Sequence, residues 1–196
     1  MNVLNYADLL PAGAQGANET LQGLVVGNRV PKDYFITQGT GESDITVHAG
    51  SYHLALKKAG IEMSNIMTYS SIMPAFANEI PKPKQITHGA VMESIFAVAN
   101  GNKGERLTAG IVYGWLHDKQ TGQRFGGLVC EHNGNYPVAE IKQLLTSSLY
   151  ELYTNGFEDQ YELKNIRMLT ESFVPEKKFG TALVAICFTN YFYPIQ

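Results

Sequence analysis

The chain is predicted to fold as an α+β layered domain, and three features of its sequence lead to this prediction. Its 196 residues, of which 44% are hydrophobic, are enough for one domain with a sizeable core. Strand-like segments follow one another through short turns, which favours antiparallel pairing. One long segment, 138–153, carries apolar residues three and four positions apart, as in a helix that buries one face on a sheet. Helices beside antiparallel strands define the α+β class.

Residues 1–29 are interpreted as an N-terminal extension, and residues 30–196 as a single domain. Met1 to Gly27 is rich in Ala, Gly, Asn and Leu. A helical turn at Asn5 to Leu10 is expected to end at Pro11-Ala12-Gly13. The extension is expected to pack loosely or to join a neighbouring subunit, and it lacks the basic region and long apolar run of a signal peptide.

The first half of the domain is predicted to contain a strand, a turn and a helix. The strand at 33–37 leads into Gly39-Thr40-Gly41, which is interpreted as a turn. No Lys followed by Ser or Thr comes after these glycines, so they do not form a phosphate-binding loop. Ser51 is expected to cap a helix over 52–59, and Gly60 to end it.

The second half is predicted to begin with an extended connector and to continue as strands around one helix. Two prolines keep Pro81-Lys82-Pro83-Lys84 extended. Three strands joined by short turns then form an antiparallel meander, the helix over 138–153 follows and ends at Asn155-Gly156, and two strands close the chain. The five strands are expected at 90–99, 107–117, 125–131, 161–173 and 180–192.

Charge and composition narrow the classes of partner. The net charge of -3 and the scattered lysines and arginines give no reason to expect nucleic acid or a membrane surface. No apolar run approaches the roughly 18 residues of a membrane span. Cys130 and Cys187 lie in apolar segments and are interpreted as reduced core residues of a cytoplasmic protein. His48, His88 and His117 are too irregularly spaced to predict a metal site.

The most informative stretch of the sequence is Asn65 to Pro74. Asn65 to Tyr69 has the composition of a half-buried strand, whereas Pro74 cannot continue a central strand because it has no N–H to donate. Ser70-Ser71 is therefore predicted at a strand end, where the backbone turns. By itself such a pair is typical of a polar strand terminus.

Several segments elsewhere in the chain give this serine pair another interpretation. They are Pro31-Lys32-Asp33-Tyr34-Phe35, Gly39-Thr40-Gly41-Glu42-Ser43, Ala59-Gly60-Ile61, Asn65, Ser70-Ser71-Ile72-Met73-Pro74 and Gly126-Gly127-Leu128-Val129-Cys130-Glu131-His132. In this order they resemble the pyruvoyl-dependent arginine decarboxylases, in which the serine pair is a cleavage site and the glutamate is catalytic. The resemblance covers most of the chain from Val30 onward, and Met1 to Gly27 has no counterpart in it.

The resemblance implies a fold, an assembly and a maturation step. The fold is a four-layer αββα sandwich with antiparallel sheets, assembled as a homo-trimer or a hexamer with active sites at the subunit interfaces. The bond between Ser70 and Ser71 cleaves itself, which leaves residues 1–70 as the β-chain and residues 71–196 as the α-chain. Ser71 becomes a covalent pyruvoyl group, which is the cofactor.

The expected reaction explains why such a cofactor is needed. Removing the carboxylate of an amino acid leaves a carbanion, and a carbonyl that forms a Schiff base with the substrate amine supplies the electron sink. Pyridoxal phosphate would need a lysine in a phosphate-binding setting, which the sequence does not suggest. A serine hydroxyl that attacks the preceding carbonyl gives an ester instead. Elimination then frees a dehydroalanine, which hydrolyses to the pyruvoyl group.

Asn65 and Glu131 are the further catalytic candidates. Asn65 matches the family's asparagine that assists the attack, and on a straight strand it would share a face with Ser71; the alternative is a solvent-facing amide. Glu131 ends the apolar run Leu128-Val129-Cys130, where desolvation would raise its pKa and suit it to return a proton to the α-carbon. The alternative for Glu131 is an exposed strand-end glutamate, and His132 is given no role.

Substrate choice is where the sequence departs from the family pattern. The family's acidic residue that holds the guanidinium of arginine falls on His53, and a histidine cannot replace a carboxylate as the partner of a permanent cation. Either the alignment differs there, or Glu62, Asp44 or Glu42 supplies the charge, or the substrate is another amino acid. The candidates for substrate binding are His53, Glu62, Ser64 and Ile72.

The sequence therefore predicts a self-processing pyruvoyl-dependent decarboxylase that converts arginine to agmatine and CO2. A pyruvoyl-dependent decarboxylase of a different amino acid is the first alternative. A catalytically silent trimeric homologue with a structural or binding role is the second. The intact Ser70-Ser71, Asn65 and Glu131 argue against a silent protein.

Overall fold

A computed structural model of the chain describes residues 3–5, 22–24 and 28–194. The chain forms two compact units, of which the larger is Pro31–Asn190 and the smaller combines Met1–Val30 with Tyr191–Gln196. In the smaller unit, β1 (Val3–Asn5) pairs antiparallel with β2 (Gln22–Leu24). The helical turn predicted near the N-terminus falls partly on β1 and otherwise outside the described residues.

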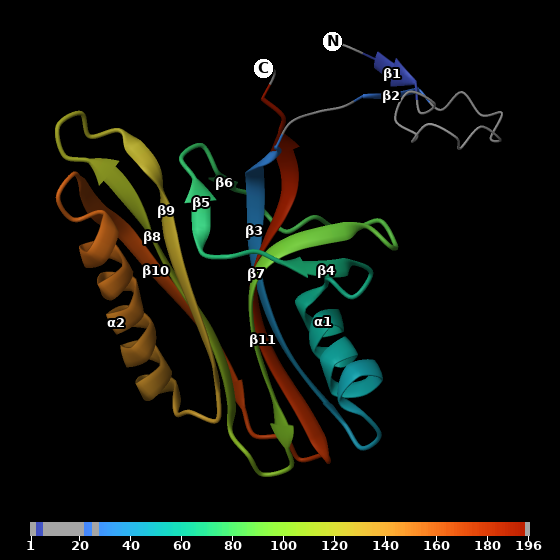
Figure 1. Cartoon of the computed structure of the whole chain (residues 1–196). Coiled ribbons are helices and arrows are strands. Elements are labelled where there is room, and N and C mark those ends of the chain that lie inside the picture. Colours follow the sequence, from blue (N-terminus) through green and yellow to red (C-terminus); the bar gives the residue numbers. More distant parts are fainter. Residues whose placement is uncertain (1–2, 6–21, 25–27, 195–196) are drawn as a thin grey trace, which may run out of the picture. The chain divides into compact units, whose positions relative to one another are not determined.

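Two sheets lie face to face in the larger unit, with one helix on the outer side of each (Figure 1). One sheet has the strand order β10-β8-β9-β5, and the other has the order β4-β7-β11-β3-β6. α2 (Val138–Gly156) covers the four-stranded sheet, and α1 (His53–Ala59) covers the five-stranded sheet. The strands are β3 (Val30–Ser43), β4 (Asn65–Thr68), β5 (Ile72–Pro74), β6 (Asn78–Glu79), β7 (Val91–Asn102), β8 (Leu107–Asp118), β9 (Arg124–Gly134), β10 (Tyr161–Phe173) and β11 (Phe179–Phe192). The predicted α+β sandwich is confirmed.

The pairing of the strands differs between the two sheets. Every pair in the four-stranded sheet is antiparallel, as predicted. In the five-stranded sheet β7 and β11 are antiparallel, whereas the edge strands β4 and β6 run parallel to β7 and β3. The sheet that leads into Ser70-Ser71 is therefore mixed.

The core has a layer between the sheets and a layer beneath each helix. Between the sheets, the Tyr34 ring lies edge-on to Tyr113 and Phe188, with centroids 6.5 and 6.4 Å away. The predicted apolar face of α2 packs on the four-stranded sheet through Ile141 and Leu145, which are fully buried four residues apart. Neither helix in the described part of the chain combines the length and the apolar character that crossing a bilayer requires.

Gly39 and Gly41 lie inside β3, so the turn predicted there is wrong. They allow the strand and the helical segment to touch, because a Cβ on Gly39 would lie 2.3 Å from the carbonyl oxygen of Ala55. A Cβ on Gly41 would lie 2.2 Å from the carbonyl oxygen of Ser51. The glycines thus serve close packing rather than chain reversal.

Gly41→Ala is expected to destabilise the fold by about 1–3 kcal/mol, because the added methyl must push the helical segment away from β3. Thermal unfolding followed by circular dichroism would show this as a lower midpoint. Gly156→Ala is the matched control, since a Cβ there meets nothing within 4 Å. Equal midpoints for the two variants would contradict the packing argument.

The helix on the five-stranded sheet begins earlier than predicted. A π-helical segment, Val47–Tyr52, precedes α1. Ser51 lies within this segment and does not cap α1. The Ser51 side chain is buried, and its Oγ lies 2.9 Å from Oγ1 of Thr181. Gly60 ends α1 with a φ of 74°, which confirms the predicted stop.

The predicted meander is wrong at its first connection. β7 pairs with β4 and β11 in one sheet, whereas β8 pairs with β9 and β10 in the other. The turn after β7 therefore carries the chain from one sheet to the facing one, and only β8 and β9 form the expected hairpin. A short turn has the same sequence signature in both cases, which is why the pattern could not separate them.

Candidate active site

The Ser70–Ser71 bond lies where the chain passes from the five-stranded to the four-stranded sheet, between β4 and β5. On one side, the N–H of Tyr69 donates to the carbonyl of Ser94 on β7 at 2.8 Å. On the other side, the carbonyl of Ser71 accepts from the N–H of Val129 on β9 at 2.9 Å. The bond is thus held at both ends by neighbouring strands of different sheets.

A tight turn is centred on Ser71. The N–H of Ile72 donates to the carbonyl oxygen of Ser70 at 3.1 Å, so the hydrogen bond encloses only three residues. A donor on this oxygen draws electrons from the carbonyl carbon. The carbonyl that precedes Ser71 is therefore polarised by the backbone itself.

Glu131 lies beside Ser71, and the structure brings these two predicted residues together. The Ser71 hydroxyl lies close enough to the Glu131 carboxyl to favour its ionised form. Desolvation raises the pKa of Glu131, while hydrogen bonds from its own backbone and from Ser71 lower it, and the net direction is upward. Part of the side chain is open to solvent in the single chain, although its carboxyl is partly withdrawn from water.

Asn65 lies at the first residue of β4, and Ser71 follows the end of that strand. The side-chain amide of Asn65 donates a hydrogen bond to the carbonyl of Gly89 at 3.0 Å. Six residues of extended chain span about 20 Å, which is too far for a direct contact along a straight strand. Next to it, the Ser64 hydroxyl is buried without a hydrogen-bond partner among the described residues.

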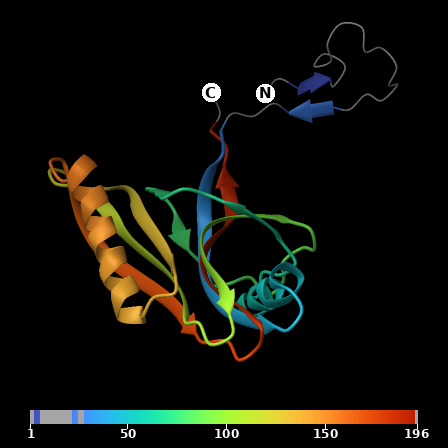
Figure 2. The same ribbon diagram turned by 60° about the horizontal axis from the view of Figure 1, so that its bottom comes forward.

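The predicted substrate residues are distributed over two regions. His53 is the exposed first residue of α1, on the outer side of the five-stranded sheet, and Figure 2 shows α1 and α2 on opposite sides of the sheets. Glu62 follows α1 and lines a cavity of about 360 Å³ together with His88. Ile72, by contrast, lies on β5 beside Ser71 and is 58% exposed.

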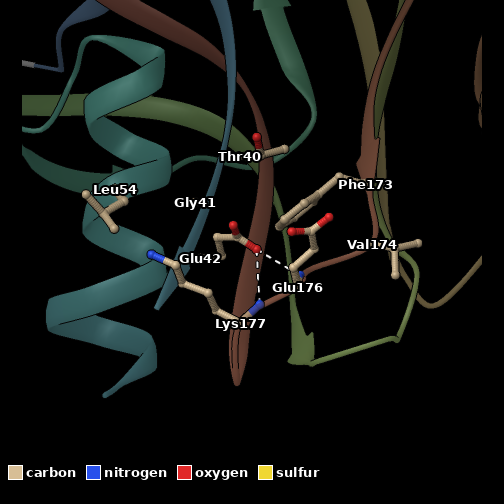
Figure 3. A pocket seen from close by; sticks show the side chains of 8 residues that line it. All are labelled: Thr40, Gly41, Glu42, Leu54, Phe173, Val174, Glu176 and Lys177. Carbon is tan, nitrogen blue, oxygen red and sulfur yellow. Dashed lines mark hydrogen bonds between the residues drawn. The ribbon is translucent and has the colours of Figure 1, made fainter. Parts of the chain in front are cut away.

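Glu42 lines a second cavity, of about 620 Å³, between β3, α1 and the turn after β10 (Figure 3). Its carboxylate accepts hydrogen bonds from the N–H groups of Glu176 at 2.8 Å and Lys177 at 3.3 Å. Asp44 accepts from the N–H of Lys178 at 3.2 Å. Both carboxylates hold the turn between β10 and β11, which leaves Glu62 as the stronger alternative source of charge.

The two cysteines are free, and neither has the environment of a reactive thiol. Burial raises the pKa of Cys130 to about 11, and the adjacent Glu131 adds to this shift. Burial raises the pKa of Cys187 to about 12. Within the described residues, His, Cys, Asp and Glu side chains form no group that could hold a metal ion.

Sequence patterns missed the backbone groups of the site. The N–H groups of Ile72 and Val129 and the carbonyl of Ser94 fix the serine pair, but any residue type could supply them. Only the pairing of β5 with β9 and of β4 with β7 places them there. The one available signal was Pro74, which was expected to stop the strand that leads into the serine pair. That strand, β4, ends at Thr68, and Pro74 instead ends β5, a strand after the serines that was not predicted.

Comparison with known proteins identifies the family. The pyruvoyl-dependent arginine decarboxylase family matches residues 33–192. The chain is similar to the pyruvoyl-dependent arginine decarboxylase AaxB of Chlamydia muridarum, with 30% identity over 84% of this chain and 94% of the relative. For AaxB of Chlamydia pneumoniae the identity is 29%, over 86% and 95%. For the pyruvoyl-dependent arginine decarboxylase of Methanopyrus kandleri it is 29%, over 81% and 97%.

These matches confirm the resemblance seen in the sequence. They span almost the whole larger unit, including the serine pair and β9 with Glu131. Enzymes of this kind are carboxy-lyases with a covalently bound pyruvoyl cofactor. The chain belongs to the pyruvoyl-dependent arginine decarboxylase family.

Proposed function

We propose that this chain cleaves itself between Ser70 and Ser71 and then decarboxylates arginine to agmatine and CO2. The observation that carries the proposal is the proximity of the Ser71 side chain to the Glu131 carboxyl, in a chain that matches the family over residues 33–192. The proposed nucleophile thus lies beside a group that can accept its proton. The names of the relatives support arginine as the substrate.

In the proposed cleavage, the Ser71 oxygen attacks the carbonyl carbon of Ser70 while Glu131 takes up the hydroxyl proton. The N–H of Ile72 is placed to stabilise the negative charge that develops on the Ser70 oxygen. The peptide C–N bond breaks as the ester forms, and the freed nitrogen takes a proton. Loss of the Ser71 α-proton then breaks the ester C–O bond and releases Ser70 as a carboxylate. Water hydrolyses the dehydroalanine that remains to a keto group and ammonia.

The surroundings of Ser71 fit a pyruvoyl group, because the group is made from Ser71 itself and a carboxyl lies at its side chain. Once formed, the group supplies a carbonyl that draws electrons from the bound substrate. The carbonyl oxygen of residue 71 stays tied to the N–H of Val129, which holds the residue on β9. Glu131, whose pKa is raised, is the proposed donor of the proton that replaces the carboxylate on the α-carbon.

We infer that the active site is shared between copies in a homo-trimer or a hexamer. Ser70, Ile72 and Glu131 are all exposed in the single chain, and an apolar side chain as open as Ile72 at a reactive position favours a covering partner. Asn65 and His53 would then act on the pyruvoyl group of a neighbouring copy rather than on their own. A cytoplasmic location is proposed on the free cysteines.

The substrate is best tested at His53, since this position also favours the alternative of a different amino acid. We expect His53→Asp to raise kcat/KM for arginine by about tenfold or more, because a carboxylate can bind the guanidinium bidentately. Release of CO2 from each amino acid would be measured with both enzymes. Glu62→Gln is the companion variant, and a large loss with arginine there would place the charge at Glu62. If the wild-type enzyme instead prefers another amino acid, the proposal that arginine is its substrate is wrong.

A further inference from the structure

Arg124, the first residue of β9, holds the backbone that follows β5. Its Nε donates to the carbonyl of Ala75, and its Nη2 donates to the carbonyl of Ala77 at 3.0 Å. The guanidinium carbon lies over the ring of Trp115 on β8, 4.1 Å from its centroid, so the group also makes a cation–aromatic contact. Three contacts therefore fix this one side chain and the segment it binds.

The strand β5 needs such support because it is only three residues long. Pro74 has no N–H, so the ladder between β5 and β9 ends there. At the other end, the carbonyl of Ser71 accepts from the N–H of Val129. Arg124 takes over as donor just beyond Pro74, so that β5 is attached to β9 at both ends.

The register of β5 decides where Ser71 points. Met73 is fully buried and lies opposite Gly127, where a Cβ would come within 3.1 Å of the Met73 Cβ. A slip of one residue would turn every side chain of so short a strand to the other face. The hydroxyl of Ser71 would then point away from Glu131.

We propose that Arg124 is a positioning residue for self-cleavage: by fixing the far end of β5 it keeps the Ser71 hydroxyl beside Glu131. The inference rests on the proposed self-cleavage and adds a residue outside the reacting groups. Arg124 acts through its hydrogen bonds to the carbonyls of Ala75 and Ala77, beyond the C-terminal end of β5.

A second arginine offers a matched comparison. Arg167 on β10 also lies over an aromatic ring of β8, with its guanidinium carbon 5.6 Å from the Tyr113 centroid. It pairs with the carboxylate of Glu79 on β6 and not with the end of β5. The change Arg167→Ala therefore also removes a contact between a guanidinium and an aromatic ring, but it leaves the hydrogen bonds that attach the end of β5 intact.

The test follows the precursor from the moment it is made. The chain is synthesised in a cell-free system with a short labelling pulse, and conversion of the 196-residue chain into its two fragments is timed on denaturing gels. We expect Arg124→Ala to slow cleavage by about tenfold or more and Arg167→Ala by no more than about twofold, because a small displacement of a reacting group has a large effect on rate. Arg124→Lys, which keeps the charge without the fork of donors, should fall between Arg124→Ala and wild type.

Added guanidinium separates positioning from general stability. Arg124 is exposed, so millimolar guanidinium can reach the space left by Arg124→Ala and should restore much of the cleavage rate there and leave that of Arg167→Ala unchanged. Cleavage of Arg124→Ala at the wild-type rate would overturn the inference alone. So would equal slowing of both variants without a response to guanidinium. A wild type that never cleaves would overturn the proposed function and this inference with it.

Discussion

Ser71→Ala is expected to remain one uncleaved chain of 196 residues with no decarboxylase activity. The methyl group has no oxygen to attack the carbonyl of Ser70, and no keto group can form from it. The tight turn itself should persist, because its hydrogen bond from Ile72 to Ser70 uses only backbone atoms. Intact mass under denaturing conditions, beside a CO2-release assay, checks both parts of this prediction.

Ser70→Ala is the control for the change at Ser71. It removes an exposed hydroxyl but keeps the carbonyl that is attacked and the place of Ser71 beside Glu131. This variant should therefore still yield the fragments 1–70 and 71–196. Two fragments from Ser71→Ala, or activity from an unbroken wild-type chain, would show that the cofactor does not arise from this serine.

Much of the fold could be predicted from the sequence, because buried apolar residues recur at the spacing of the helix or strand that carries them. The apolar residues of α2 recur at helical spacing and do pack on a sheet, and β10 begins and ends at the predicted residues. Gly60 has the left-handed conformation that its position after α1 indicated. Each of these features depends on local pattern, which one chain displays in full.

The errors arose where the arrangement in space decides the role of a residue. Gly39 and Gly41 are residues typical of a turn, yet they lie in β3. They are glycines because a side chain at either position would collide with α1 or with the segment before it. Likewise the crossing from β7 to the facing sheet has no signature beyond an ordinary turn. The spacing of apolar residues along the chain does not show which distant segments pack together.

The site shows the same division. Ser71 and Glu131 lie close together although they are sixty positions apart in the sequence; family motifs singled out each residue, and no sequence pattern placed them together. The backbone donors that hold the serine pair could not be foreseen, because their residue type is irrelevant. His53, predicted to bind the substrate, is the first residue of α1, which packs on the five-stranded sheet.

Glu131 is proposed to accept a proton during cleavage and to donate one during turnover. The rates of the two reactions should therefore depend on pH in opposite directions. In the precursor it must be ionised to accept the Ser71 proton, so the cleavage rate should rise as pH rises through its pKa. In the mature enzyme it must be protonated, so turnover should fall as pH rises through its pKa. Desolvation raises this pKa, and consuming Ser71 removes a hydrogen bond that lowered it. The fall in turnover is therefore expected at a higher pH than the rise in cleavage.

Glu131→Gln is expected to cleave slowly but completely and to turn over about 10²–10⁴-fold less well, because the amide accepts a hydrogen bond from Ser71 yet carries no transferable proton. Its residual activity should no longer fall with pH in the range where the wild type does. Glu162→Gln is the matched control: Glu162 is an exposed glutamate on β10 whose ion pair with Lys164, at 2.8 Å, contributes little. Fragment formation by intact mass and kcat across pH would be measured for all three proteins. If fully cleaved Glu131→Gln kept the wild-type kcat and its pH dependence, the proton that replaces the carboxylate would have to come from another group.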